Sequence, residues 1–206
     1  ATTRQGGSGD DRYRFLGNWG QTTISDTSGA NWLDFEAQTQ AVTVNDAQLK
    51  AWQGGNTVKW EKADTIDRIR GGSGGDLLDF SGDDGDLLIT LTGMNQGWVT
   101  NAAGGMTQTG LNAGAVQQAV GDDRGYGYKF EGFEHVIGGR GSDVVLVRDG
   151  AGISGSLTGE STLGDRDNQR NTLDFSEYSR GVTVNLEGSS AFGSANNSQV
   201  QVRGFH

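Results

Sequence analysis

Short segments in which apolar and polar residues alternate recur along the chain. Three copies pair a Leu-Asp-Phe triplet with a later apolar segment: Leu33–Phe35 with Val42–Asn45, Leu78–Phe80 with Leu87–Ile89, and Leu173–Phe175 with Val182–Asn185. Alternation with a period of two is typical of a strand that buries one face. The second segment begins nine residues after the first in every copy. This spacing predicts short strands separated by turns of about six residues.

Three glycine-rich blocks form a second repeat. They are Gly6–Asp11, Gly71–Asp76 and Gly138–Asp143, and their last aspartates lie 65 and 67 residues apart. We therefore divide the chain into repeat blocks near residues 6–70, 71–137 and 138–206, within a single elongated domain covering residues 1–206. Repeats of this kind indicate a fold that grows by stacking similar units.

The repeats predict an all-β fold, a parallel β-solenoid or β-roll built from diverged tandem repeats. Two short strands and two turns give a lap of about 18 residues, and each strand pairs in parallel with the strand one lap away. The last residues, Val202–His206, resemble Phe130–His135, which leads into a glycine block. We therefore expect the sequence to be a segment of a longer chain.

Composition narrows the functional classes. The 206 residues include 36 Gly, no Pro and no Cys, with 19 Asp against 7 Glu and a formal net charge of −10. A disulfide scaffold and a collagen helix are excluded, and no apolar run is long enough for membrane insertion. The negative charge argues against nucleic acid as a partner and favours cations.

The glycine blocks share the pattern Gly-Gly-x-Gly-x-Asp-x-apolar-x, with Tyr13, Leu78 and Val145 at the apolar position. This pattern resembles the nonapeptide of the RTX family, the hemolysin-type calcium-binding repeats of large bacterial secreted and surface proteins. Glycines let carbonyl oxygens approach a point inside the turn, and Asp is short enough to reach the same point. Such hard oxygen atoms are the ligands that Ca²⁺ prefers.

The resemblance implies a right-handed parallel β-roll with Ca²⁺ held between turns on the same side. The candidate ligands are the block aspartates with their neighbours and a degenerate turn at residues 81–86: Asp10, Asp11, Asp76, Asp83, Asp84, Asp86, Asp123 and Asp143. The expected partner turns are Gln53–Asn56 for the block at Gly71 and Gly121–Asp123 for the block at Gly138. The alternative is that each Asp caps its own turn through backbone hydrogen bonds, without a metal.

Sequence signatures of an enzyme are weak, and we expect no enzymatic activity. The chain has no Cys nucleophile, and a hydroxyl–His–Asp set would have to use His135. No nucleophile elbow or phosphate-binding loop accompanies it. Abundant carboxylates are better explained by the repeat.

We therefore expect a structural or adhesive calcium-binding module of a secreted or surface-displayed bacterial protein. It would fold when Ca²⁺ neutralises its carboxylates outside the cell, and it could associate end to end into filaments. Two alternatives stay open. One is a solenoid that binds or modifies surface polysaccharide, suggested by Trp19, Trp32, Trp52, Trp60 and Trp98. The other is a calcium-independent spacer.

Overall fold

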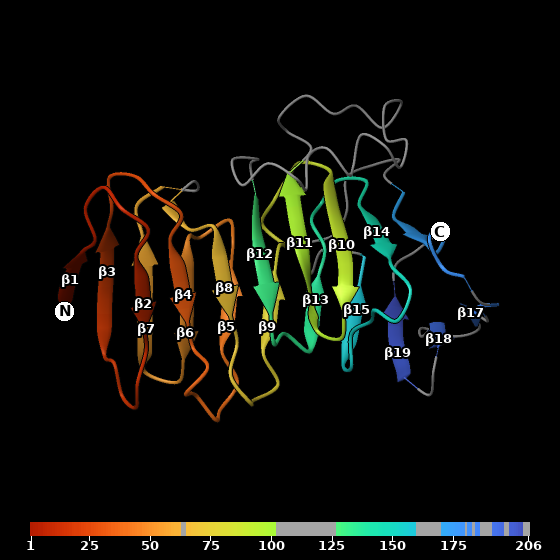
Figure 1. Cartoon of the computed structure of the whole chain (residues 1–206), viewed down its shortest axis with the longest axis horizontal. Coiled ribbons are helices and arrows are strands. Elements are labelled where there is room, and N and C mark those ends of the chain that lie inside the picture. Colours follow the sequence, from red (N-terminus) through yellow and green to blue (C-terminus); the bar gives the residue numbers. More distant parts are fainter. Residues whose placement is uncertain are drawn as a thin grey trace.

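The computed structural model describes residues 1–62, 65–101, 127–159, 170–179, 181–182, 184–185, 191–195 and 198–203. Strands and turns make up this part of the chain, which contains no α-helix. The prediction of an all-β fold is therefore confirmed. The strands lie side by side along the long axis of the molecule and run across it (Figure 1). Nowhere in the described ranges is there a helix that is long and apolar enough to cross a membrane.

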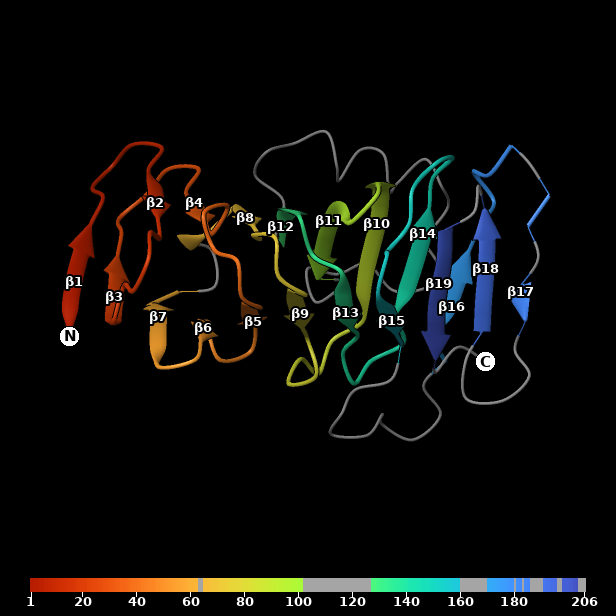
Figure 2. The ribbon, with the colours of Figure 1, turned by 90° about the horizontal axis from the view of Figure 1, so that it is seen from below.

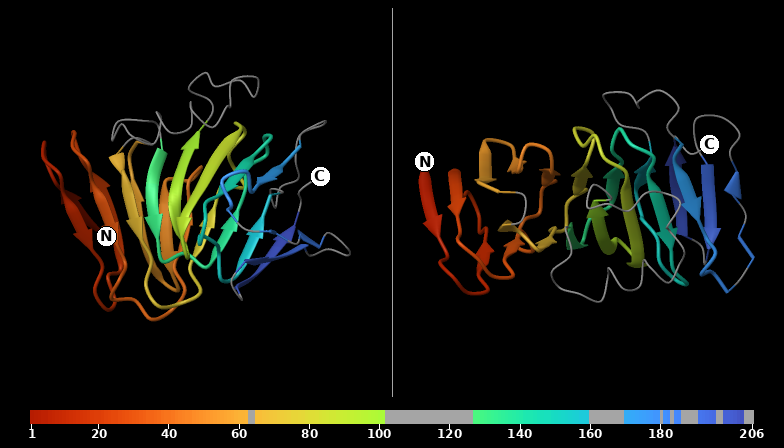
Figure 3. Two further views of the ribbon diagram at one scale, coloured as in Figure 1. Left: turned by 45° about the vertical axis from the view of Figure 1, so that its right-hand side comes forward. Right: turned by 90° about the horizontal axis from the view of Figure 1, so that it is seen from above.

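The strands form two open sheets that lie face to face as two layers (Figures 2 and 3). The eleven-stranded sheet has the order β1 (Thr2–Gln5), β3 (Gln21–Ser25), β7 (Asn56–Trp60), β6 (Lys50–Gln53), β5 (Thr43–Asn45), β9 (Leu77–Asp79), β13 (His135–Ile137), β15 (Ser156–Thr158), β19 (Ser198–Arg203), β18 (Ala191–Ala195) and β17 (Val184–Asn185). The eight-stranded sheet has the order β16 (Thr172–Asp174), β14 (Val144–Val147), β10 (Leu87–Gly93), β11 (Gln96–Asn101), β12 (Gly127–Glu131), β8 (Arg68–Arg70), β4 (Trp32–Asp34) and β2 (Arg12–Arg14).

The core lies between the layers and consists of rows of equivalent residues from neighbouring strands. In the eight-stranded sheet, parallel pairing aligns Tyr13, Leu33, Ile69 and Phe130, and all four side chains are buried. The opposite layer contributes a similar row, formed by Val44, Leu78, Val136 and Leu157. The apolar positions of the sequence repeats therefore meet in the core, as the alternation predicts.

Pairing is not parallel throughout, so this part of the prediction is wrong. Three groups of consecutive strands form antiparallel meanders: β5–β6–β7, β10–β11–β12 and β17–β18–β19. In the first, the chain passes from β4 to β5 and then returns through β6 and β7 to pair in parallel with β3. The first meander lies in the eleven-stranded sheet and the second in the eight-stranded sheet, so inserted strands lengthen both layers.

The predicted lap of about 18 residues is wrong wherever a meander intervenes. Aligned positions on neighbouring strands are 20 residues apart for Tyr13 and Leu33 and 36 apart for Leu33 and Ile69. The separation reaches 58 residues between Leu78 and Val136. Strands inserted into one layer lengthen the path of the chain before it returns to the neighbouring position.

The Leu-Asp-Phe triplets end their strands in the same way. In each, the Asp Oδ1 accepts a hydrogen bond from the backbone amide two residues later. The N–O distances are 3.0 Å for Glu36 and Asp34, 2.9 Å for Ser81 and Asp79, and 2.7 Å for Ser176 and Asp174. Such bonds favour a turn over continuation of the strand. The predicted strand–turn organisation of these repeats is confirmed.

Replacement of Ile69 by Ala should measure how strongly the core rows stabilise the fold. Ile69 is 1% exposed and lies between Leu33 and Phe130. We expect Ile69→Ala to lower the free energy of unfolding by about 2–5 kcal/mol in urea denaturation, because it leaves a cavity. Leu16→Ala is the control, since Leu16 is 59% exposed, and it should change stability by less than about 0.5 kcal/mol. Equal effects of the two variants would contradict this view of the core.

Candidate metal sites at the glycine–aspartate turns

The three glycine blocks form turns that carry the chain from one sheet to the other. Gly6–Asp11 joins β1 to β2, Gly71–Asp76 joins β8 to β9, and Gly138–Asp143 joins β13 to β14. In each block, a Cβ on the first glycine would overlap a carboxylate oxygen of the last aspartate. The aspartate therefore folds back over its own turn, and the first residue must be Gly.

Asp76 shows what this folded carboxylate does. Its Oδ2 accepts the amide hydrogen of Gly72 in its own turn over 2.5 Å, and its Oδ1 accepts that of Val42 in a neighbouring turn over 2.7 Å. Its own amide donates to Glu134 Oε2 over 2.9 Å. Asp76 is fully buried. Burial raises the pKa of Asp76 above its ordinary value, and the two amide hydrogen bonds oppose that rise.

Asp143 makes the same kinds of hydrogen bond just before β14 of the eight-stranded sheet. Its Oδ2 accepts the amide hydrogen of Gly139 over 2.7 Å, and its Oδ1 accepts that of Leu87 over 2.9 Å. Its own amide donates to Asn171 Oδ1 over 2.9 Å, and the residue is fully buried. Both aspartates thus link the backbone of their own turn to the backbone of a neighbouring turn through hydrogen bonds. Capping of its own turn by Asp is the metal-free alternative given in the sequence analysis.

The turn beside the block at Gly71 differs from the one expected. The block at Gly71 stacks on residues 38–42 rather than on Gln53–Asn56: the Ser73 amide donates to the Gln38 carbonyl over 2.9 Å. A Cβ on Gly72 would overlap that carbonyl, so glycine permits the close approach of the two turns. The block at Gly138 stacks on residues 83–87. Gly121–Asp123, the turn expected beside the block at Gly138, lies outside the described residues.

The first block leaves one carboxylate oxygen without a partner. The Asp11 amide donates to Asn31 Oδ1 over 2.9 Å, but Asp11 Oδ2 is buried and makes no hydrogen bond in the described structure. It lies beside Gly6, together with Asp26 Oδ2 and the Tyr13 hydroxyl. The Tyr13 hydroxyl donates to Asp26 over 2.5 Å. Burial and the two carboxylates raise the pKa of Tyr13 well above its ordinary value. By contrast, the exposed Asp10 accepts the Ala30 amide over 2.8 Å.

The degenerate turn contains three candidate ligands in different roles. Asp86 Oδ1 accepts the Ser142 amide hydrogen over 2.7 Å, and Asp84 Oδ1 lies 3.2 Å from Arg140 Nη1. Asp83 Oδ2 is buried and has no hydrogen-bond partner in the described structure. The structure thus brings this turn against the block at Gly138, next to Asp143.

Asp83 has a strongly raised pKa. Burial, as the largest cause, and the negative charges of Asp46, Asp143, Asp79 and Asp84 together raise the pKa of Asp83 to about 7. The sequence prediction misses two acidic residues near these carboxylates. Asp26 lies beside Asp11, and Asp46 lies near Asp83. Asp46 directly follows the Val42–Asn45 segment, but only strand pairing brings it near the degenerate turn.

In the described structure, Asp11 and Asp83 differ from the other candidate ligands in having a buried oxygen without a partner. Asp76 and Asp143 use both carboxylate oxygens for backbone amides, so they do not offer a prepared ligand set. Asp11 and Asp83 each have a buried oxygen with no partner and further carboxylates nearby, which suits a hard cation. Within the described ranges, no group of three or more His, Cys, Asp or Glu side chains is arranged to hold a metal ion.

His135, the residue that a hydroxyl–His–Asp set would use, lies on β13. Its Nδ1 is 2.9 Å from Ser156 Oγ and also accepts the Ser156 amide hydrogen over 3.2 Å. The contact joins β13 to β15, which are neighbours in the eleven-stranded sheet. It adds a side-chain link between paired strands.

Searches against protein-family models, curated proteins and solved structures found no match.

Replacement of Asp76 by Asn tests the backbone cap. Asn offers one accepting oxygen, so its NH₂ group would face an amide hydrogen of Val42 or Gly72. We expect Asp76→Asn to lower the free energy of unfolding by about 1–3 kcal/mol. Asp10→Asn is the matched control, because Asp10 is exposed and accepts one amide hydrogen, which Asn can also accept. Urea denaturation of both variants checks this; unchanged stability of Asp76→Asn would rule out a stabilising cap.

Asp83 predicts a pH dependence of stability. Its pKa rises from 3.8 to about 7 on folding, so the protonated form favours the folded state. The stability that this proton contributes is fully present below about pH 4 and is lost as the pH rises to about 7. Without calcium, wild type should therefore lose stability relative to Asp83→Asn across this range. Urea midpoints measured at a series of pH values check this, and a constant difference between the two proteins would contradict it.

Proposed function

We propose that this chain is a structural module of a secreted or surface-displayed bacterial protein, with the path of a β-solenoid interrupted by antiparallel meanders. The observation that supports it best is the alignment of repeat positions into buried rows, such as Tyr13, Leu33, Ile69 and Phe130. A fold of this kind depends on contacts between neighbouring laps and provides a long rod.

The meanders are compatible with a solenoid path because the parallel rows resume beyond them. On the far side of the first meander, β5 pairs in parallel with β9, and on the far side of the second, β10 pairs in parallel with β14. The chain also continues to alternate between the layers from β12 to β13 and β14. The meanders are therefore insertions that lengthen the rod, rather than boundaries between separate folds.

Calcium binding by this module is supported at Asp83 and at Asp11, rather than at the fully buried aspartates. Asp83 Oδ2 would supply one ligand, and Asp46, Asp79 and Asp84 contribute negative charge to its surroundings without forming a ligand set with it in the described structure. A bound Ca²⁺ neutralises clustered carboxylates, and its binding energy then stabilises the folded state. Folding would thus be favoured where calcium is abundant, as outside the cell.

The adhesive and extracellular parts of this proposal are supported by the RTX-like glycine blocks and by the absence of Cys. Association end to end is a further part of it. The strands of both sheets stack along the long axis of the molecule, and this stacking is the geometry through which another copy would extend the rod into a filament.

Calcium titration tests the metal part of the proposal separately from the fold. We expect Ca²⁺ to raise the melting temperature of metal-free protein, as followed by far-ultraviolet circular dichroism, whereas Mg²⁺ should have little effect. At a concentration 100 times its Kd, the ion would add about 2.7 kcal/mol. The effect should grow between about pH 5 and 8, because Asp83 must lose its proton to bind the ion.

Variants locate the ion. Asp83→Asn and Asp11→Asn should each remove part of the calcium effect, whereas Asp10→Asn should retain all of it. A β spectrum and melting temperature that do not respond to calcium would show that the module is a calcium-independent spacer. The structural part of the proposal would stand in that case, since the buried rows do not depend on the ion.

A further inference from the structure

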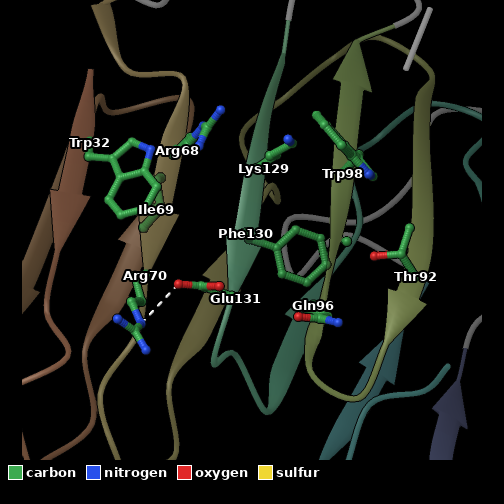
Figure 4. Close-up of a pocket in the computed structure, with 11 residues that line it drawn as sticks. Trp32, Arg68, Ile69, Arg70, Thr92, Gln96, Trp98, Lys129, Phe130 and Glu131 are labelled. Atoms are coloured by element: carbon green, nitrogen blue, oxygen red, sulfur yellow. Dashed lines mark ion pairs between the residues drawn. The ribbon is translucent and has the colours of Figure 1, made fainter. Parts of the chain in front are cut away.

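Side chains hold one another in place around a groove of about 330 Å³ on the eight-stranded sheet. Figure 4 shows Trp32 and Trp98 at its two sides, and Arg68 and Lys129 align on β8 and β12 between them. The Arg68 guanidinium lies 5.3 Å from the centroid of the Trp32 ring, and Lys129 Nζ lies 3.9 Å from that of Trp98. These cations are thus covered by neighbouring rings. A reactive pair of residues without such cover lies instead in a turn.

The turn after β14 contains the sequence Arg148-Asp149-Gly150-Ala151 and is closed by one backbone hydrogen bond, from the Ala151 amide to the Arg148 carbonyl over 2.9 Å. Asp149 and Gly150 form the tip of this turn, and both are exposed. Gly150 has a φ of +77°, and a Cβ on it would meet no atom within 4 Å. Its amide donates no hydrogen bond to any described residue. The peptide between Asp149 and Gly150 therefore has room to rotate.

An Asp-Gly step with this freedom can rearrange without a further reactant. The amide nitrogen of Gly150 attacks Cγ of Asp149, and the new C–N bond closes a five-membered succinimide ring. The amide hydrogen and the hydroxyl of the protonated carboxyl group leave together as water. Glycine favours this closure, because it has no Cβ to hinder the approach and its backbone is the most flexible.

Water then opens the ring in one of two ways. Cleavage of the bond between the nitrogen and Cγ restores aspartate. Cleavage of the bond between the nitrogen and the main-chain carbonyl carbon leaves the chain connected through the side chain, as isoaspartate. The second product has one more carbon atom in its main chain, so the regular spacing of neighbouring Cα atoms is lost at this step.

A second Asp-Gly step, Asp84–Gly85, differs in the surroundings of its glycine. The Gly85 carbonyl packs so closely on the block at Gly138 that a Cβ on Gly141 would lie 2.4 Å from its oxygen. The preceding Asp83 carbonyl accepts the Arg140 amide over 2.7 Å, so the backbone is held on both sides of this step.

The two carboxylates do not distinguish the steps, because each has a partner. Asp84 lies 3.2 Å from the Arg140 guanidinium, and Asp149 accepts a hydrogen bond from the Ser179 hydroxyl. The difference lies in the backbone: stacking of turns fixes Gly85, whereas Gly150 is open. The fold therefore favours ring closure at Asp149 over ring closure at Asp84.

The turn that contains Asp149 is braced on two sides. On one side, the Arg148 amide donates to the Leu91 carbonyl of β10 over 3.1 Å. On the other, the turn after β16 supplies Glu177, whose Oε2 lies 2.9 Å from Arg148 Nε, and the Ser179 hydroxyl, which donates to Asp149. A longer main chain at Asp149 would displace groups that these neighbours hold in place.

We propose that Asp149–Gly150 is a site of spontaneous aspartate isomerisation in the folded protein, and that isoaspartate there loosens the contact between the turns that follow β14 and β16. The step requires neither calcium nor a partner, so the proposal is independent of the function proposed above. Because it needs only water and time, isoaspartate at this turn would record the age of each molecule.

Peptide mapping of the aged protein tests the site. The folded protein is incubated for several weeks in mildly acidic buffer, well below its melting temperature, and then digested. Mass spectrometry with electron-transfer fragmentation distinguishes isoaspartate from aspartate, and the succinimide appears as the loss of one water. We expect the peptide with Asp149 to accumulate isoaspartate at least about tenfold faster than the peptide with Asp84, a ratio that corresponds to a barrier difference of about 1.4 kcal/mol.

The same incubation in urea separates the fold from the local sequence. In the unfolded chain the two steps are equally free, and their rates should become similar. Asp149→Glu should abolish the modification at this turn, because glutamate would have to close a less favourable six-membered ring. Asp84→Glu is the matched control and should leave it unchanged. Aged wild type should melt at a lower temperature than aged Asp149→Glu, whereas the two fresh proteins should differ less.

The opposite results would overturn the proposal. Equal isomerisation of the two steps in the folded protein, or none at Asp149, would refute the site. A preference for Asp149 that persists in urea would also refute it, because the preference would then arise from local sequence. If ageing lowers the melting temperatures of wild type and Asp149→Glu equally, isoaspartate does not loosen the turns.

Discussion

The contact on which the described fold most depends is the buried aspartate that joins one turn to the next. Asp76 and Asp143 each accept one amide hydrogen from their own turn and one from a neighbouring turn. A buried carboxylate is costly unless it is hydrogen bonded, so these bonds define which turns can stack. The first glycine leaves room for the carboxylate, and the second allows a neighbouring carbonyl to approach. The glycine–aspartate pattern is thus first a requirement of turn stacking.

Much of the fold follows from sequence patterns that act locally. The alternation in the Leu-Asp-Phe repeats predicts strands with one buried face, and Leu33 and Leu78 are indeed fully buried. Their aspartates end the strands through hydrogen bonds to residues two positions later, which depend on nearby sequence alone. Local patterns of this kind can be interpreted before any long-range contact is known.

Contacts between distant segments could not be predicted in the same way. The strand Lys50–Gln53 has no clear alternation of apolar and polar residues, and its place is set by pairing with β5 and β7. The proximity of Asp46 to Asp83 and the alignment of Arg68 with Lys129 likewise depend on which strands are neighbours. Because the meanders change the length of the lap, spacing in the sequence does not identify those neighbours.

The same aspartate motif has two outcomes, and the amide of its own turn distinguishes them. At Asp76 and Asp143, Oδ2 lies beside the first glycine of the block and accepts the amide hydrogen of the second glycine. At Asp11, Oδ2 lies beside the first glycine in the same way but has no hydrogen-bond partner in the described structure, and Asp26 Oδ2 and the Tyr13 hydroxyl lie next to it. A cation competes poorly with two amides already in place, but it can satisfy an oxygen that has none. The calcium binding proposed above is therefore best supported where the turn leaves this oxygen without its amide, rather than where the motif is complete.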